Sequence, residues 1–186
     1  LVGNLMNQAG ITDKIFAFAL SLVGHLKGSL AHVNVVSSII FAGVSGVAQA
    51  DAAGLGVIEM KAMDDAGYDK AFPAAVTATS SIIGPIIPPS VTMAVFSVIS
   101  GISLGKLFMA GFLPGLIMGL SLMGLIYFFA ATGRVTGKVF PRPPFGVILK
   151  HFWGAFPALA TPVILVVGML AGAATPTELG AVCAVY

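Results

Sequence analysis

The side chains best suited to bind a ligand flank two interruptions of otherwise apolar sequence. The first interruption is GVSG at 43–46, and the second is SIIGPIIPPS at 81–90. Oxygen atoms are the ligands that a hard cation such as Na⁺ prefers, whereas zinc prefers sulfur and imidazole. We therefore expect the interruptions to bind a cation through oxygen. The flanking oxygen-bearing side chains are Asn34, Ser37, Ser38, Ser45, Thr77, Thr79, Ser80, Ser81, Ser90 and Thr92.

Asp51 is the most informative single residue, because it lies in the apolar run AQADAAGLG. An ionisable side chain at membrane depth is costly and is a functional candidate by default. A structural alternative stays open, in which Asp51 lies near cytoplasmic water or pairs with Lys27 or Lys61.

The other reactive side chains are expected to have structural rather than catalytic roles. Glu59 and Lys61 are expected to mark the cytoplasmic interface, and the isolated His25 and His32 to be packing or interface residues. Ser45 lacks the preceding strand and the base partner of a serine hydrolase. The single cysteine, Cys183, excludes an intramolecular disulfide framework. We predict that the chain is not an enzyme.

Composition places the chain in lipid. Of 186 residues, 58% are apolar and only 9% are charged, and the mean hydropathy is +1.03. A soluble domain has roughly a quarter charged residues, so a soluble enzyme, a nucleic-acid-binding protein and a disordered chain are all excluded. The 23 glycines and 11 prolines predict broken helices, which survive at membrane depth only around protein or a watery cavity.

The first apolar stretches predict a helix and a hairpin. A helix is expected over 14–31 with Asp13 or Thr12 as N-cap, followed by a re-entrant helical hairpin over 33–60 whose two arms would each cover about 15 Å. One kinked span over 33–60 is the alternative. A polar loop over 61–70 follows.

The remaining segments predict three further apolar elements. Pro85, Pro88 and Pro89 break the stretch 71–101 into two half-helices. A span over 106–131, kinked near Pro114, leads to a loop at 132–144, an amphipathic segment at 145–156 and a last span over 157–173. The run TPTE at 175–178 starts a further element of unknown role.

Basic residues set the expected orientation. Arg134, Lys138, Arg142 and Lys150 lie in one segment without an acidic residue, which predicts a cytoplasmic location. The loop at 61–70 would then also be cytoplasmic, and both interruptions would meet at half-membrane depth. There, exposed carbonyls bind cations and half-helix N-termini attract anionic groups.

At this point the sequence resembles a known family. The segment 28–115, with FAGVSGVAQADAAGLG, GYDKAFPAA, IIPPS and LFMAGFLPG, and GAATPTELGAV further on, is similar to the large membrane subunit of tripartite ATP-independent periplasmic (TRAP) transporters. The order and spacing of these runs are more specific than any one of them. The chain departs from the usual pattern at Ser29 and Gln49, and neither change removes an expected ligand.

The resemblance implies an all-α membrane protein with an elevator-type ion-transporter fold. Family members are about twice as long, with two inverted halves, so we expect a fragment that holds the first half and the start of the second. The implied divisions are a scaffold helix at 1–32, the hairpin at 33–60, the loop and broken helix of the transport domain at 61–101, a helix at 102–131, a basic loop and interface helix at 132–156, and a last helix with the start of the second half at 157–186.

The resemblance also implies a function. It is Na⁺-coupled import of an organic acid across the bacterial or archaeal inner membrane, with a periplasmic substrate-binding protein and a small membrane subunit as partners. An elevator transporter of anions or dicarboxylates that is coupled to Na⁺ or H⁺ and needs no binding protein is the alternative. The implied Na⁺ site comprises Gly43, Val44, Ser45, Gly84, Pro85 and Ile86, supported by Asp51, and the implied substrate-binding residues are Ser45, Thr79 and Ser90.

Overall fold

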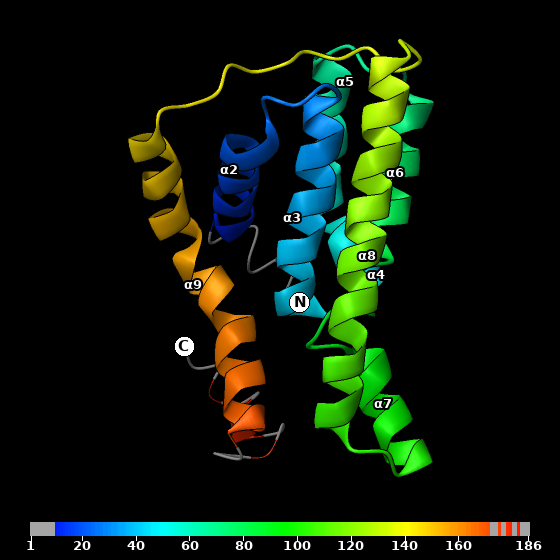
Figure 1. Cartoon of the computed structure of the whole chain (residues 1–186), viewed down its shortest axis with the longest axis vertical. Helices are drawn as coiled ribbons and strands as arrows, with labels where there is room; N and C mark the ends of the chain where they lie inside the picture. The colour runs from blue at the N-terminus through cyan, green and yellow to red at the C-terminus, as the bar shows by residue number, and fades with distance from the viewer. Residues whose placement is uncertain (1–9, 172–174, 176–177, 180–181, 183–186) are drawn as a thin grey trace.

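The computed structural model describes residues 10–171, 175, 178, 179 and 182, and the described part of the chain is helical, without strands. The helices lie roughly along one long axis (Figure 1). The expected all-α fold is confirmed over this part. The helices are α2 (Ile11–Val23), α3 (Ser29–Ser45), α4 (Ala48–Ala53), α5 (Leu55–Asp65), α6 (Ala71–Ser81), α7 (Val91–Ser100), α8 (Leu104–Ala131) and α9 (Phe145–Leu170).

The segment from α3 to α5 is a helical hairpin. Helix α3 ends at Ser45, the chain reverses over Gly46 and Val47, and α4 and α5 return beside α3 (Figure 1). Gly46 has φ 62°, a left-handed conformation that favours glycine, and its amide caps α3 at Ala42 O. The described residues therefore form a helical hairpin, and the alternative of one kinked span is wrong, while re-entry of the hairpin into a membrane stays a prediction.

The next segment is the predicted broken helix. Helix α6 ends at Ser81, residues 82–90 are turns and bends, and α7 begins at Val91. The Ser90 hydroxyl caps α7 by accepting from Met93 N at 3.2 Å. Proline has no amide hydrogen to donate, so the three prolines of the break cannot continue the backbone hydrogen bonds of α6.

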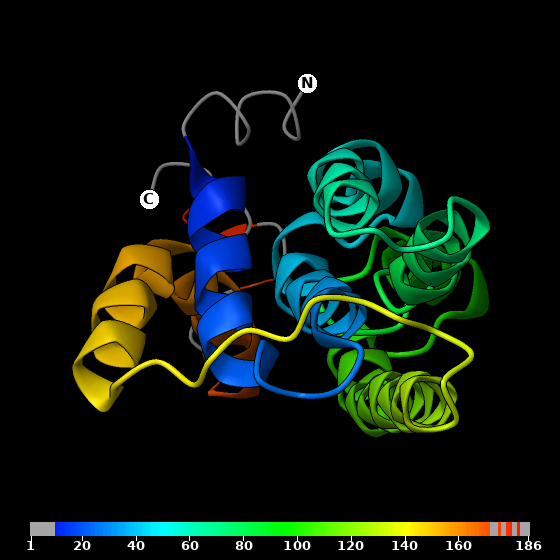
Figure 2. The ribbon, with the colours of Figure 1, turned by 90° about the horizontal axis from the view of Figure 1, so that it is seen from above.

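Two long helices complete the described fold. Helix α8 runs beside the hairpin and the broken helix, and residues 132–144 then cross to α9 at the end where α5 and α6 are joined (Figures 1 and 2). Phe140 N donates to Gly24 O at 3.1 Å, and Gly137 lies against the ring of Tyr68. Burial under this crossing raises the pKa of the Tyr68 phenol. The two polar loops therefore lie at one end of the molecule, as expected.

Several predicted boundaries are wrong. The first helix covers Ile11–Val23 rather than 14–31, with Gly10 before it, so neither Asp13 nor Thr12 is its N-cap. Gly28, with φ 80°, ends the connection and lets α3 begin at Ser29 rather than at residue 33.

At two places where the sequence predicts a boundary between elements, the structure has a continuous helix. The polar run after Glu59 is not a loop from residue 61, because α5 continues to Asp65 with Met63 buried and Lys61 exposed on its outer face. Residues 145–156 and the last span up to Leu170 form one helix, α9, which contains Pro157 and Pro162 and bends midway (Figure 1). Residues 172 and 173 of the predicted span lie outside the described residues.

Two residues of the TPTE run, Thr175 and Glu178, lie within the described part of the chain and bond to each other. Thr175 N and its hydroxyl both donate to Glu178 Oε2 at 2.7 Å, and Glu178 N donates back to the Thr175 hydroxyl at 3.4 Å. This is a capping box at a helix start. The bonds from the Thr175 backbone and hydroxyl lower the pKa of Glu178. Cys183 lies outside the described residues.

Apolar surface is exposed over α7, α8 and α9. The side chains of Val98, Ile99 and Phe145 are 85%, 79% and 77% exposed. By length and composition, two described helices could cross a bilayer, over Leu104–Ala131 and Phe145–Met169. These observations agree with the predicted membrane protein.

A stripe of glycines brings α8 close to the break. Gly111, Gly115 and Gly119 are buried on one face, four residues apart, and lie against Met93, Ile87 and Ile39. Small residues at this spacing let helices approach closely. A Cβ atom at Gly111 would lie 2.5 Å from the carbonyl oxygen of Ile86.

Replacing Gly111 by alanine is therefore expected to destabilise the protein by about 1–3 kcal/mol, the usual cost of overpacking. Gly124→Ala is the matched control, since a Cβ atom at Gly124 of the same helix meets nothing within 4 Å. Thermal unfolding of the two purified variants in detergent tests this prediction. Equal unfolding temperatures would contradict the close approach of α8 to the break.

Candidate functional site

The hairpin tip and the helix break meet. Val91 N, at the start of α7, donates to Gly46 O at the tip at 3.4 Å. A Cβ atom at Gly46 would collide with the carbonyl oxygen of Pro89, and one at Gly84 would lie 3.6 Å from Ala48 N. Two interruptions about 40 residues apart in the sequence therefore form one structural unit, as predicted.

Four helix ends converge at this unit. Helices α3 and α6 end there, and α4 and α7 begin there (Figure 1). Helix C-termini present carbonyl oxygens with partial negative charge, and N-termini present amide hydrogens with partial positive charge. The unit can therefore bind a cation through carbonyls of α3 and α6, and an anionic group near the start of the ten-residue α7.

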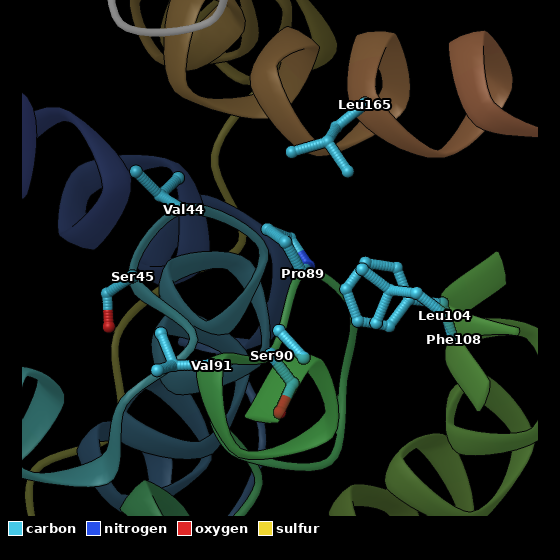
Figure 3. A pocket seen from close by; sticks show the side chains of 9 residues that line it. Val44, Ser45, Pro89, Ser90, Val91, Leu104, Phe108 and Leu165 are labelled. Carbon is cyan, nitrogen blue, oxygen red and sulfur yellow. The ribbon is translucent and has the colours of Figure 1, made fainter. Parts of the chain in front are cut away.

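A pocket of about 350 Å³ opens between the tip, the break and the long helices. Ser45 of the tip and Ser90 of the break are among its lining residues, while Phe108 and Leu165 contribute apolar side chains from α8 and α9 (Figure 3). A mostly apolar pocket with a few polar groups is typical of a small-molecule site. The remaining lining residues are Val44, Pro89, Val91, Ala94 and Leu104.

The hairpin-tip residues predicted to bind the ion lie as follows. Gly43 is buried and faces Pro162 of α9, while Val44 and Ser45 are half-buried in the pocket lining. The Ser45 hydroxyl bonds to both the amide and the carbonyl of Val47, at 3.3 and 3.2 Å. The hydroxyl is therefore fixed beside the reversal of the chain.

The predicted ligands in the break lie close to the tip, and the carbonyl of one of them already accepts hydrogen bonds. Gly84 is buried, and Pro85 and Ile86 are half-buried. The Pro85 carbonyl accepts from the hydroxyls of Ser90 and Thr92, at 2.5 and 3.2 Å. A cation bound to this carbonyl would replace at least one hydroxyl.

Thr79 does not join the unit. Its side chain is exposed, and its hydroxyl donates to Ala75 O of its own helix at 2.7 Å. Its position gives no support to the predicted substrate contact, whereas Ser45 and Ser90 line the same pocket.

Asp51 lies inside the protein, on the first turns of α4. The side chain is 2% exposed, and neither carboxylate oxygen has a hydrogen-bond partner. The nearby Ser38 and Ser81 hydroxyls donate elsewhere, to Ser80 Oγ at 3.1 Å and to Thr77 O at 2.7 Å. Lys27 and Lys61, the alternative partners, are both exposed.

An unpaired buried carboxylate beside carbonyl-rich helix ends fits a hard cation such as Na⁺. The available donors are oxygen atoms, and within the described residues no group of three or more histidine, cysteine, aspartate or glutamate side chains could hold a metal ion. The arrangement therefore suits Na⁺ and offers no zinc-type ligand set there.

Glu59 is the residue that sequence reasoning misplaced. It was expected at the cytoplasmic interface, but its side chain is 1% exposed and its Oε2 accepts from Asn34 Nδ2 at 2.6 Å. A signal was present in the sequence, because Leu55, Glu59 and Met63 are spaced by four and share the buried face of α5.

Comparison of the sequence with known proteins identifies a family and several relatives. The family model described as "Tripartite ATP-independent periplasmic transporter, DctM component" matches residues 1–186. Over 187 residues the chain is 48% identical to the sialic acid TRAP transporter large permease protein SiaM of Vibrio cholerae. Over 190 residues it is 45% identical to the sialic acid permease SiaT of Haemophilus influenzae, and over 188 residues 38% identical to the C4-dicarboxylate permease DctM of Pseudomonas aeruginosa.

These alignments cover all of this chain but only 43%, 30% and 43% of the three relatives. The chain thus spans less than half the length of each relative. All three are named as transporter permeases, in agreement with the prediction that the chain is not an enzyme.

The contact between tip and break gives a direct prediction. Gly46→Ala and Gly101→Ala both place a side chain on a left-handed residue, with φ 62° and 70°. Each should cost about 1–2 kcal/mol for that conformation. Gly46→Ala should lower the unfolding temperature further, because only its methyl group meets the Pro89 carbonyl. Thermal unfolding of both variants checks this, and equal losses would contradict the docking of the tip on the break.

Proposed function

Since the chain belongs to the family of DctM components of tripartite ATP-independent periplasmic transporters, we propose that it is part of a permease that imports an organic acid together with Na⁺. The observation that supports this most strongly is the convergence of four helix ends where the hairpin tip meets the break. Secondary transporters use such discontinuous helices to hold a coupling ion and an anionic substrate together.

The proposed Na⁺ site uses the tip and the break. Backbone carbonyls of Gly43, Val44, Gly84, Pro85 and Ile86 and the hydroxyl of Ser45 would hold the ion. Bound Na⁺ supplies one positive charge. Asp51, which has no hydrogen-bond partner of its own, would balance that charge from behind the tip.

The proposed substrate is a carboxylate. Relatives of the chain are named for sialic acid and for C4-dicarboxylates, both of which carry carboxylate groups. Ser45 and Ser90 would face such a group from the pocket, with the N-terminus of α7 beside them. Thr79 is not included, because its side chain lies on the exposed face of α6.

Membership of the family supports a proposal on partners and movement. The hairpin and the broken helix would form part of a transport domain that moves as an elevator against the α8 and α9 scaffold, in a multi-pass inner-membrane protein. A periplasmic binding protein would deliver the substrate, and a small membrane subunit, separate or fused, would support the scaffold. The rest of the permease would add a second hairpin and a second broken helix.

Uptake by proteoliposomes tests the proposal. The full-length permease with its small subunit should import a labelled organic acid from its loaded binding protein only when a Na⁺ gradient is present. Uptake driven by a proton gradient without Na⁺ would overturn the ion assignment. Uptake of free substrate without the binding protein would favour the alternative, an elevator transporter that needs no such partner.

Asp51→Asn should raise the Na⁺ concentration for half-maximal uptake by about tenfold, within the range of coupling energies between sites. The charge that balances the ion is then lost while the shape is kept. Asp65→Asn is the matched control, because Asp65 is exposed at the end of α5 and should leave the Na⁺ requirement unchanged. An unchanged Na⁺ requirement in Asp51→Asn would assign Asp51 a structural role.

A further inference from the structure

A layer of buried polar side chains joins the hairpin to the first half of the broken helix. Asn34 and Ser38 of α3, and Thr77 and Ser80 of α6, are each 4% exposed or less. Several of their hydrogen bonds cross from one helix to the other, because Asn34 bonds to Thr77 and Ser80, and Ser38 also bonds to Ser80. The layer is therefore a cross-link between two elements that are more than 40 residues apart in sequence.

Asn34 is fixed by three short hydrogen bonds. Its Nδ2 donates to Glu59 Oε2 of α5 at 2.6 Å and to Thr77 Oγ1 at 2.8 Å. Its Oδ1 accepts from Ser80 Oγ at 2.6 Å. A side-chain amide has two hydrogens to donate and one carbonyl oxygen that accepts. Both hydrogens and the oxygen are engaged here, so these contacts favour a single orientation of the amide.

Ser80 bonds to two successive turns of α3. Its hydroxyl donates to Asn34 Oδ1 and accepts from Ser38 Oγ at 3.1 Å. Asn34 and Ser38 are four residues apart and therefore lie on the same face of the helix. A slide of α3 by one turn, about 5.4 Å, would break the bond to Asn34 and leave buried polar atoms without partners, which is costly. The bonds of Ser80 therefore set the register of α3 against α6.

Ser80 is also the residue from which the helix break begins. Its backbone carbonyl accepts from Ile83 N at 3.0 Å, and the Ile83 carbonyl accepts from Ile86 N at 3.0 Å. Gly84 N donates to Ser81 O at 3.1 Å. The ion ligands proposed in the break, Gly84 to Ile86, therefore lie in turns that are bonded to the last two residues of α6.

The other side of the cross-link leads to the hairpin tip. Helix α3 continues without interruption from Ser38 to Ser45, a length of about 10 Å. The amide of Gly46 then caps the helix on Ala42 O at 3.1 Å. The Ser80 hydroxyl thus connects the two sets of proposed ion ligands, through regular helix on one side and through short turns on the other.

The direct contact between the tip and the break is weaker than this cross-link. It includes one backbone bond, from Val91 N to Gly46 O, and its length of 3.4 Å is beyond the usual range for an amide donor. A binding site requires its ligands to be held within about 0.5 Å of the productive geometry. The bonds of 2.6 Å that Asn34 makes to Ser80 and Glu59 constrain the helices more tightly than the direct contact does.

We propose that Asn34 and Ser80 are positioning residues for the proposed Na⁺ site. They set the register of α3 against α6 and, with it, the distance between the carbonyls of the tip and those of the break. Neither side chain contacts the ion. The inference rests on the proposed function, because it gives the two side chains a role in ion binding in addition to their role in folding. A structural role alone would affect the unfolding temperature but not the affinity for Na⁺.

Stabilisation by Na⁺ tests this role without transport. The full-length permease with its small subunit, in lipid, should unfold at a higher temperature as NaCl replaces choline chloride at constant ionic strength, and this dependence gives a dissociation constant. Ser80→Ala should raise that constant by about fivefold or more, because two bonds between α3 and α6 are lost. An unchanged dissociation constant in a destabilised Ser80→Ala protein would assign Ser80 a structural role and overturn the proposal.

Ser21→Ala is the matched control. Ser21 is 5% exposed, and its hydroxyl donates to Phe18 O of its own helix, α2, at 2.6 Å. This change removes a buried hydroxyl group but no hydrogen bond between helices. It should lower the unfolding temperature and leave the dissociation constant for Na⁺ unchanged. A rise as large as that in Ser80→Ala would show that Na⁺ affinity follows stability in general, and would contradict a positioning role.

A double-mutant cycle tests the cross-link itself. Either Asn34→Ala or Ser80→Ala removes the bond between the two side chains, so the double variant should lose less stability than the sum of the two single losses. Thermal unfolding of the three variants measures this difference. Additive losses would give the two side chains independent roles and overturn the cross-link. If Asn34→Ala does not fold, the Na⁺ titration of Ser80→Ala decides the question.

Uptake separates this inference from the proposed function. In proteoliposomes, Ser80→Ala should raise the Na⁺ concentration for half-maximal uptake and leave the maximal rate at saturating Na⁺ unchanged. A wild-type protein whose stability and uptake do not depend on Na⁺ would refute the proposed function, and with it any role at an ion site. A Na⁺-dependent wild type with an identical Na⁺ requirement in Ser80→Ala would refute the positioning role alone.

Discussion

A helix that is interrupted within a membrane must find partners for the backbone groups that the interruption exposes, because each unpaired group costs several kcal/mol in lipid. In this protein the two interruptions supply partners for each other. The amide that begins α7 bonds to the carbonyl of Gly46, and the hydroxyl of Ser90 satisfies both its own helix start and the Pro85 carbonyl. This contact fixes the distance between the helix ends, and with it the geometry of any ion or substrate bound there.

The contact also explains where small residues are required. Gly46 allows two backbones to approach where a side chain would collide, and the glycines of α8 bring a long apolar helix against the break. Glycine content that lowers helix stability in water is tolerated here because neighbouring helices satisfy and enclose the irregular backbone. The composition therefore reflects packing around a site rather than flexibility.

Much of this arrangement could be predicted from the residues. Prolines and glycines located the break and the hairpin tip, and hydropathy separated the helices. Boundaries failed where polar residues on one face of α5 resembled a loop, and where Gly28 rather than the polar residues decided the start of α3. Glu59 was misplaced because a charged residue near an expected interface was assigned to water. Only tertiary packing shows that Asn34, 25 residues away in sequence, is its partner.

The buried polar layer gives the hairpin a property that apolar packing would not provide. Asn34, Thr77 and Ser80 bond across α3, α5 and α6, so the hairpin and the first half of the broken helix are held together by directional contacts. Directional networks favour one register over others that apolar side chains would tolerate. A transport domain of the proposed kind would need such a register, because the proposed ion site is divided between the hairpin and the break. The same layer encloses the Glu59 carboxyl, because Asn34 Nδ2 donates to its Oε2, so the contact that aligns the two elements also fixes an acidic side chain inside the protein.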